Sequence, residues 1–390
     1  MTNLIFLLFG LISLTISTSI YVSQPNFFSI LLWKVSSVNG GKMKKNVVIS
    51  PPSIEVILKM LFHAMPKSHR NELKSYGHFR EGTFQHDEIT NLKEAQSHIS
   101  KKDFEFEFEN KLFIAYGFIV KNNYLNNILK YLGVTKNSIQ SINFNQSFNA
   151  TNTINHFISK VTRNRINKII FEGDISSDTR VVLVNAVYLK AAYMVSFNKR
   201  YTQKRDFKSF SMNRVTKVDT MYMPETTYKY LINKEMQIVQ IPYKVKGLNL
   251  IVVKRFDGKN IENSERVIDE FYAQGQKGPI NLFLPKFSIS SKVDLKPILE
   301  SMNIRNIFSK DADFSEITDN KLKVEKIIHV ANIDVDEVGT TAAAATAAFM
   351  SGRSLAEIPD TIRMDSSFSA YLTYGESRMI LFSAFVDNLN

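Results

Sequence analysis

Residues 337–354 form the part of this chain whose side-chain types and spacing carry the clearest chemical meaning. The segment opens with Glu337, Val338, Gly339, Thr340 and Thr341, continues with Ala342, Ala343, Ala344, Ala345 and Thr346, and closes with Gly352, Arg353 and Ser354. Nearly every side chain before Phe349 is small and uncharged. Residues 337–346, the hinge segment, could therefore enter a packed β-sheet without overpacking it. Arg353 follows as a lone basic residue, and a guanidinium pairs bidentately with a carboxylate at the base of a binding pocket.

A surface helix is the alternative interpretation of this alanine-rich run, because alanine is the best helix former. The flanking residues favour a strand instead. Residues 323–336 carry many β-branched apolar side chains, which is typical of a buried strand. Gly339 breaks the run, and residues 351–360 contain Gly352 and Pro359, which indicate a loop. We therefore predict a strand, then the hinge segment, then an exposed loop, with hinge and loop together spanning residues 337–357.

Local motifs of the common enzyme classes are missing from the sequence. There is no G-x-S-x-G, H-E-x-x-H, P-loop or G-x-G-x-x-G pattern. The seven histidines show no metal-ligand spacing, and the chain has no cysteine for a disulfide, a zinc-thiolate site or a thiol nucleophile. A hydrolase therefore lacks support, and we expect neither enzyme activity, nor a metal site, nor a cofactor.

The composition indicates one large folded domain. The chain has 390 residues, of which 44% are hydrophobic and 22% charged, so it can bury a sizeable core. No flexible linker and no internal repeat divides it. Residues 4–16 are nearly all apolar and are followed by Ser17 and Ser19, which predicts a secretory signal peptide over 1–19 and a mature domain over 20–390. An N-terminal membrane anchor is the alternative, but the apolar run is short for a span.

If the chain is secreted, its glycosylation sequons and its positive net charge become relevant. Asn145 and Asn149 each begin an Asn-x-Ser/Thr sequon, and their closeness favours occupancy of only one. The net charge of +12 suggests attraction to polyanions, and contact with a glycosaminoglycan is left open. The basic residues are scattered, without the aromatic platform of a nucleic-acid site. We expect a secreted, extracellular monomer that binds neither nucleic acid nor membrane.

Hydrophobic periodicity predicts the elements that position the hinge segment. We expect helices over residues 27–35, 53–65, 123–132, 149–164 and 261–273. We expect strands over residues 47–50, 104–120, 181–190, 215–223, 237–243, 248–256, 280–287, 323–336, 368–374 and 378–386. Helices come mostly first and antiparallel strands mostly later, so the expected fold class is α+β.

Five short motifs together resemble the serpin family over nearly the whole mature length. Residues 46–54 resemble its buried strand-to-helix entry, 183–190 the central strand of its large sheet, 284–287 its Leu-Pro-Lys-Phe strand, 312–315 its Ala-Asp-Phe-Ser turn, and 335–345 the hinge of inhibitory members. The chain departs from the family pattern at Tyr193, where tryptophan is usual, and at Ala191, where glycine is usual. The ending from Phe385 to Asn390 also differs from the customary one.

The resemblance implies a serpin fold, with mostly N-terminal helices around a large central mixed sheet, two further sheets and an exposed reactive-centre loop. It also implies a suicide-substrate inhibitor of a trypsin-like serine protease. The family's usual interval of sixteen residues from Glu337 assigns the reactive bond to Arg353 and Ser354. A second set, the central polar cluster, comprises Ser50, Ser53, Asn185 and His329, which match the family's residues where strands part to admit the loop. A non-inhibitory carrier, storage protein or chaperone is the alternative, but such members tend to have bulky or charged hinges.

Overall fold

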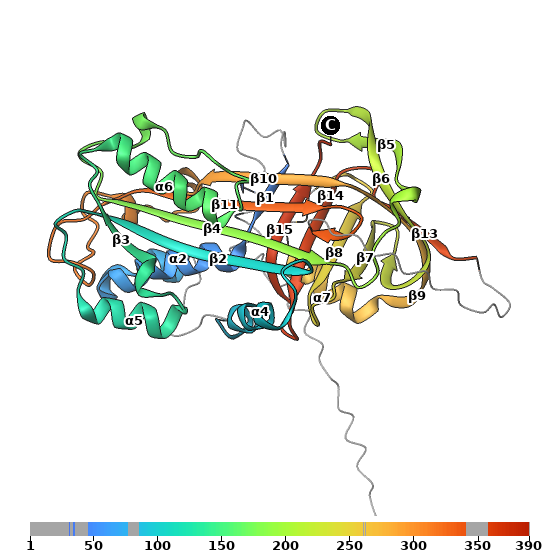
Figure 1. Cartoon of the computed structure of the whole chain (residues 1–390), viewed down its shortest axis with the longest axis horizontal. Coiled ribbons are helices and arrows are strands. Elements are labelled where there is room, and N and C mark those ends of the chain that lie inside the picture. Colours follow the sequence, from blue (N-terminus) through green and yellow to red (C-terminus); the bar gives the residue numbers. More distant parts are fainter. Residues whose placement is uncertain are drawn as a thin grey trace, which may run out of the picture.

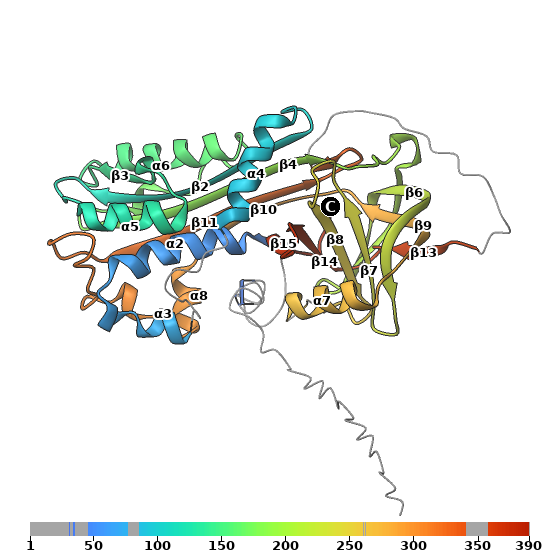
Figure 2. The same ribbon diagram turned by 90° about the horizontal axis from the view of Figure 1, so that it is seen from below.

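The long sheet of the molecule runs lengthwise between helices (Figures 1 and 2). The computed structural model describes residues 31, 34–35, 46–76, 86–259, 261, 263–340 and 358–389. The strand order of this sheet is β10-β11-β4-β2-β3, and a short strand, β12, pairs with β4 off this path. The strands are β2 (Phe104–Ala115), β3 (Ile139–Ile142), β4 (Val181–Ala192), β10 (Phe287–Asp294), β11 (Val324–Val335) and β12 (Gly339–Thr340).

Strand β4 lies at the centre of this sheet and is covered on both faces. It pairs with β2 antiparallel and with β11 parallel. Val181, Leu183 and Val187 belong to the main hydrophobic core, whereas Val182 and Val184 belong to a second core that packs under helix α6 (Ser147–Val161). A strand buried on both faces has a nearly continuous apolar sequence, which is why this strand could be predicted from its residues.

The remaining strands form one continuous sheet at the other end of the molecule (Figure 1). Its order is β1-β15-β14-β8-β7-β6-β9-β13, with β5 paired to β6 off this path. The strands are β1 (Val47–Ile49), β5 (Gln203–Ser209), β6 (Arg214–Ile232), β7 (Met236–Pro242), β8 (Asn249–Arg255), β9 (Gln276–Pro285), β13 (Asp360–Arg363), β14 (Phe368–Tyr374) and β15 (Met379–Val386). The two further sheets that the resemblance implied are one continuous sheet in this structure, in which the 19-residue strand β6 pairs with β5, β7 and β9.

The helices cover the two faces of the long sheet, with α2 and α5 on one face and α6 on the other (Figure 2). The described α-helices are α2 (Pro51–Ala64), α3 (Asn71–Ser75), α4 (His86–His98), α5 (Asn122–Leu132), α6, α7 (Ser264–Gln274) and α8 (Lys296–Ser301). Helix-rich and strand-rich regions alternate little, so the expected α+β class is confirmed.

Several expected boundaries were wrong. Helix α2 begins at Pro51 and not at Ser53, and Ser50 occupies the N-cap position. Proline is tolerated in the first turn because the backbone N–H it lacks has no intrahelical partner there. Strand β2 ends at Ala115 and not near residue 120, and the strand expected over 280–287 is divided at Lys286 between β9 and β10. Helix α4 was not predicted, because its polar sequence gives little periodic signal.

The expected signal peptide over residues 1–19 lies outside the described residues. Of the helix expected over 27–35, the structure describes Leu31, Lys34 and Val35, which are helical. Within the described residues, no helix has the length and apolar character needed to cross a membrane.

Candidate functional site

The hinge segment begins in a tight turn after β11. The Asp336 backbone N–H donates a hydrogen bond to the Gly339 carbonyl at 2.9 Å, which closes the turn. The Asp336 carboxylate in turn accepts a hydrogen bond from the Val338 N–H at 2.9 Å. Aspartate is favoured at the first position of such turns because its side chain can hold the following backbone. The chain therefore reverses direction here.

After the turn, the chain enters the long sheet. Strand β12 runs antiparallel to β4, with Gly339 opposite Ala192 and Thr340 opposite Ala191. Strands β11 and β4 are paired only as far as Asn332 and Tyr188. Beyond Tyr188, the edge of β4 that no longer pairs with β11 pairs with β12 instead. Strand β12 also contacts β11. Gly339 and Thr340 of the hinge segment thus already occupy the space between β4 and β11.

Gly339 is required by how closely β12 approaches β4. Its φ of +153° is rarely adopted by residues with a side chain, and a Cβ atom at this position would lie 2.1 Å from the Ala191 carbonyl oxygen. Any larger residue would push β12 away from the sheet. The Tyr193 N–H donates a hydrogen bond to the Val338 carbonyl at 2.8 Å. This bond also holds the turn close to the end of β4.

Thr340 is buried against aromatic side chains beneath the sheet. It is 1% exposed, and its hydroxyl shares a 2.8 Å hydrogen bond with the hydroxyl of Tyr243. The Tyr243 ring stacks on Tyr193 with centroids 5.0 Å apart, and Tyr193 meets the edge of Phe197 at 5.8 Å. Tyr193 therefore supplies the buried aromatic surface at the position where the family usually has tryptophan.

Glu337 anchors the turn through a nearly buried carboxylate. Its Oε2 lies 3.0 Å from the Lys286 Nζ, and its Oε1 accepts a hydrogen bond from the Thr202 hydroxyl at 2.8 Å. Burial alone would raise the pKa of Glu337. The hydrogen bonds from its own backbone N–H, Lys286 and Thr202, together with the charge of Lys286, outweigh burial and hold the pKa below its usual value. Glu337 is therefore ionised at neutral pH and ties the turn to two neighbouring segments.

Three members of the central polar cluster are joined by hydrogen bonds below the hinge segment. The Ser50 backbone N–H donates to the His329 Nε2 at 3.1 Å, so the ring proton sits on Nδ1, which donates to the Asn185 Oδ1. Asn185 and His329 lie opposite each other on β4 and β11. Burial lowers the pKa of His329 to about 3, so the ring is neutral at physiological pH. Ser53 lies on α2, one turn beyond Ser50, and is fully buried.

The cluster is incompletely satisfied. Among the described residues, the Ser50 hydroxyl, the Ser53 hydroxyl and the Asn185 Nδ2 find no hydrogen-bond partner, although all three are buried. A buried polar group without a partner costs ~1–3 kcal/mol. The closed sheet therefore carries unmade hydrogen bonds at the point where β4 and β11 are paired.

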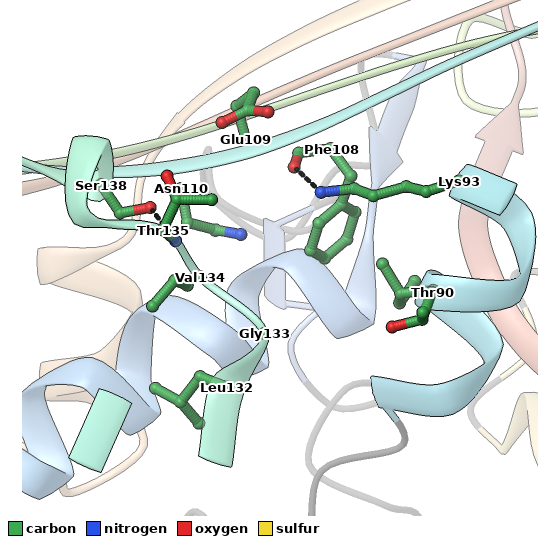
Figure 3. A pocket seen from close by; sticks show the side chains of 11 residues that line it. Thr90, Lys93, Phe108, Glu109, Asn110, Leu132, Gly133, Val134, Thr135 and Ser138 are labelled. Atoms are coloured by element: carbon green, nitrogen blue, oxygen red, sulfur yellow. Dashed lines mark hydrogen bonds between the residues drawn. The ribbon is translucent and has the colours of Figure 1, made fainter. Parts of the chain in front are cut away.

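A cavity beside the edge of the sheet is too small to be a substrate site. It lies between β2, α4 and the chain after α5, and Lys93, Phe108, Asn110 and Ser138 line it (Figure 3). The Lys93 ammonium donates to the Phe108 carbonyl at 3.3 Å across it. Its volume of about 40 Å³ suits water and not a substrate-sized molecule, since ligand pockets usually measure ~300–1,000 Å³.

Comparison with known proteins identifies the family. The sequence matches the family model of serpins, described as serine protease inhibitors, over residues 23–388. The chain belongs to the serpin family. Serpins are in general inhibitors of proteases and not enzymes, so the resemblance drawn from the five motifs is confirmed at the level of family.

Relatives of this serpin cover nearly its whole length. Antitrypsin of Bombyx mori is 28% identical over 377 residues, covering 94% of this chain and 93% of the relative. Serpin48 of the insect Tenebrio molitor has a TM-score of 0.74 at 25% identity and covers 93% of this chain and 96% of that chain. Human thyroxine-binding globulin has a TM-score of 0.77 at 25% identity and covers 93% and 96%. The expected serpin fold is therefore confirmed.

The rest of the expected site lies outside the described residues. This applies to Ala342, Ala343, Ala344, Ala345 and Thr346 of the hinge segment, and to Arg353 and Ser354 of the expected reactive bond. The sequence reasoning missed Thr202, Tyr243 and Lys286 as contacts of the hinge. Lys286 had a signal, because it stands in the Leu-Pro-Lys-Phe motif of residues 284–287, whereas nothing local marked Thr202 or Tyr243.

Both expected glycosylation residues lie at the start of α6. Asn145 is exposed and precedes the helix, and its backbone N–H donates to the Asn143 side chain at 3.1 Å. Asn149 is exposed but helical, and its side-chain amide donates to the Gln146 Oε1 at 2.9 Å. The threonine of the second sequon, Thr151, is 3% exposed. The two sequons therefore differ in local conformation.

Proposed function

We propose that this serpin is a suicide-substrate inhibitor of an extracellular trypsin-like serine protease. The protease serine attacks the Arg353 carbonyl, the Arg353–Ser354 bond breaks, and the new amine of Ser354 leaves with the C-terminal fragment. Arg353 remains bonded to the protease as an ester. The freed hinge segment then inserts into the long sheet as a strand between β4 and β11. The observation that carries this proposal is that Gly339 and Thr340 already pair with β4.

The register of β12 supports insertion of the small residues that follow. If the pairing of Thr340 with Ala191 continues residue by residue along β4, Ala342 would come opposite Leu189 and Ala344 opposite Val187. Residues directly opposite each other in an antiparallel pair share a face of the sheet. The even-numbered hinge residues would therefore meet the main core, and the odd-numbered ones would face α6. Small side chains are needed on both faces.

The same register would bring Thr346 opposite Asn185. Asn185 is hydrogen-bonded to His329 on β11, so an inserting strand must separate these two residues. A threonine hydroxyl both donates and accepts hydrogen bonds. Thr346 would thus arrive beside the central polar cluster, where three buried polar atoms have no partner among the described residues. Insertion would relieve part of the cost that the closed sheet carries.

Insertion provides the free energy that traps the protease. Strand β4 has 12 residues, and about a dozen new ladder bonds at ~0.5–1.5 kcal/mol each would contribute on the order of 10 kcal/mol. Each inserted residue carries the attached protease ~3.3 Å further along the sheet. Distortion of the protease's oxyanion hole and triad would leave the ester unhydrolysed. Inhibition is then a race between insertion and hydrolysis.

The direct test is to incubate the mature protein with a panel of Arg-specific serine proteases and to look for SDS-stable adducts. We expect a covalent complex and a released C-terminal peptide that begins at Ser354 by mass spectrometry. Arg353→Ala should abolish inhibition of these proteases with an unchanged melting curve. Ser351→Ala, in the same loop, should retain it. A peptide that begins elsewhere would contradict the assignment of the bond.

A non-inhibitory carrier is the second candidate. A groove of about 500 Å³ lies between α6, β2 and β3, lined among others by Glu107, Lys111, Phe157 and Arg163, and this volume is in the range of small-molecule sites. Similarity to thyroxine-binding globulin also favours this candidate. The carrier needs no loop insertion, so the absence of any covalent complex across the protease panel would favour it over the inhibitor.

Secretion and glycosylation complete the proposal. The apolar N-terminal segment over 1–19 supports a signal peptide, and the exposure of Asn145 and Asn149 is what a glycan requires. We expect Asn145 to be the occupied residue, because it lies outside α6. Glycopeptide mass spectrometry of protein secreted from eukaryotic cells would test this, with Asn145→Gln and Asn149→Gln as the matched pair. We also expect a monomer with no metal or other cofactor, and contact with a glycosaminoglycan stays open.

A further inference from the structure

An aromatic and arginine row crosses four strands at one end of the molecule. Tyr222 on β6, Phe283 on β9 and Arg363 on β13 lie side by side in register. The rings of Tyr222 and Phe283 stack with centroids 4.6 Å apart, and the Arg363 guanidinium carbon lies 4.1 Å from the Phe283 centroid. Arg205 on β5 brings a second guanidinium carbon to 4.6 Å from the same centroid. We call these four residues the arginine row.

Neither guanidinium of the arginine row has an acidic partner among the described residues. Within the described part of the chain, Arg205 donates a 3.4 Å hydrogen bond to Gln203, and its buried Nε–H has no acceptor. Neighbouring acidic residues are engaged elsewhere. Asp219 binds Lys204 at 3.2 Å, Asp206 binds Lys217 at 2.9 Å, and Asp360 accepts a hydrogen bond from the Tyr230 hydroxyl. The row therefore presents two ring-stacked cations whose charge is not balanced locally.

The surroundings extend the positive surface. Tyr201 is 46% exposed and packs edge-on against Tyr222 with centroids 6.1 Å apart. The two residues before it, Lys199 and Arg200, are exposed. Tyrosine and arginine are the residues enriched in the energetically important parts of protein interfaces.

The arginine row is also close to the expected reactive bond along the chain. Strand β13 is the first described strand after the loop, and it lies at the end of the molecule with β9 and β6 (Figure 1). Arg363 follows Arg353 by ten residues, a stretch that spans at most ~35 Å when fully extended. A protease that binds the uncut loop at Arg353 would therefore lie within reach of this surface.

We propose that the arginine row is a second contact site for the target protease, and that it binds carboxylate-bearing side chains on the protease surface. This rests on the proposed inhibitory function. Guanidinium groups already held against a ring lose little freedom on pairing, and they match carboxylates bidentately. The arginine row would raise the rate at which the inhibitor associates with proteases that have acidic surfaces. Arg353 would instead select proteases whose specificity pocket accepts arginine.

Anionic and cationic trypsin provide the test, because they share a pocket for arginine and differ in surface charge. We expect the wild-type protein to inhibit anionic trypsin faster than cationic trypsin at low ionic strength, and added NaCl to reduce the difference. The double variant Arg205→Gln/Arg363→Gln should slow inhibition of anionic trypsin by about tenfold and leave cationic trypsin nearly unaffected. The control Arg266→Gln/Lys310→Gln removes two exposed positive charges elsewhere and should change neither rate.

The remaining outcomes separate the two proposals. If covalent complexes form normally and the double variant keeps the full preference for anionic trypsin, the second contact site is wrong and the inhibitory function stands. If the double variant instead loses only its retention on immobilised heparin, the row binds sulfated polysaccharide and the protease contact is overturned. If no covalent complex forms with either trypsin, both proposals fall. Equal melting temperatures of all variants would show that folding is not the cause.

Discussion

His329 shows how strongly burial sets the behaviour of a single side chain here. Its ring accepts one hydrogen bond and donates another, so a second ring proton would break the bond to the Ser50 N–H. The pKa of about 3 in the folded protein lies well below the usual value of ~6.5. Because protonation favours the unfolded chain, the stability that depends on neutral His329 is complete above pH 6.5 and falls as the pH decreases from there toward 3.

We therefore predict that acid destabilises the wild type more than a His329→Gln variant. A single such group changes the free energy of unfolding by ~1.4 kcal/mol per pH unit. Between pH 6.5 and 5 the wild type should lose about 2 kcal/mol more than the variant, as measured by equilibrium urea unfolding. Carboxylates titrate alike in both proteins and cancel in the comparison. Parallel pH profiles for the two proteins would show that His329 is not the group responsible.

Asp387 anchors the C-terminal segment, whose sequence differs from the family's usual ending. Its carboxylate is 1% exposed and accepts hydrogen bonds from the hydroxyls of Ser209, Ser211 and Ser367. The backbone N–H of Phe210 adds another at 3.1 Å. A buried carboxylate needs several hydrogen-bond donors, and these residues provide them. The C-terminal strand is thereby fixed to the turn between β5 and β6.

At the scale of elements, the hinge segment enters the sheet where β4 and β11 separate at one end. Strands β11 and β4 are paired up to Asn332 and Tyr188, and β12 begins to fill the space above them. In the proposed mechanism, further insertion separates the remaining β4–β11 pairs in sequence, and each new side chain must fit under the sheet or under α6. The size and charge of the hinge side chains would therefore control whether insertion proceeds.

Thr340→Arg should convert the inhibitor into a substrate. The arginine would be buried without a partner at a position that is now 1% exposed, at a cost of several kcal/mol, so it should displace β12 from the sheet and remove the start of insertion. We expect the fraction of protease trapped as covalent complex to fall at least ~tenfold, while cleavage at Arg353 continues, as followed by SDS gels.

The matched control is Ile358→Arg. It introduces the same charge beyond the expected reactive bond, at a residue that is 94% exposed. This control should trap protease as the wild type does. Undiminished complex formation by Thr340→Arg would contradict the insertion mechanism.

The sequence predicted the central elements well and the contacts between distant elements poorly. β4 and β11 were identified because continuous apolar and β-branched residues mark a strand buried on both faces. The need for Gly339 was visible as a break, but its physical reason depends on the pairing with β4, which brings the Ala191 carbonyl oxygen to 2.1 Å from where a Cβ atom would lie. Glu337 was selected, whereas Thr202 and Tyr243 were missed, since no local pattern links residues 97 or more positions apart.

At the scale of the whole molecule, the proposed mechanism requires a native sheet that is less stable than the sheet with the hinge segment inserted. The sheet leaves buried polar atoms of Ser50, Ser53 and Asn185 without partners among the described residues, and it holds only the first part of a strand it could accept. In the proposed mechanism, the uncut chain between Thr340 and β13 opposes further insertion, and cleavage removes this constraint.

Cutting the loop should therefore stabilise the protein. We predict that cleavage between residues 341 and 357, mapped by mass spectrometry, raises the melting temperature by more than ~10 °C, because the freed segment adds a central strand. The same cut in Thr340→Arg should give little or no increase. Equal thermal midpoints for intact and cut wild type would favour a non-inhibitory member of the family.

The position of β15 has a consequence for how the protein is made. This strand lies between β14 and β1, and it pairs Phe385 with Val47, which lies far away along the sequence. Ribosomes deliver β15 after both of its neighbours, so the sheet that contains these strands cannot close until β15 has emerged. Until then, β1 and one edge of β14 lack their partner, and exposed strand edges are prone to pair with other chains. The interval before β15 pairs with them is when helper proteins would be needed most.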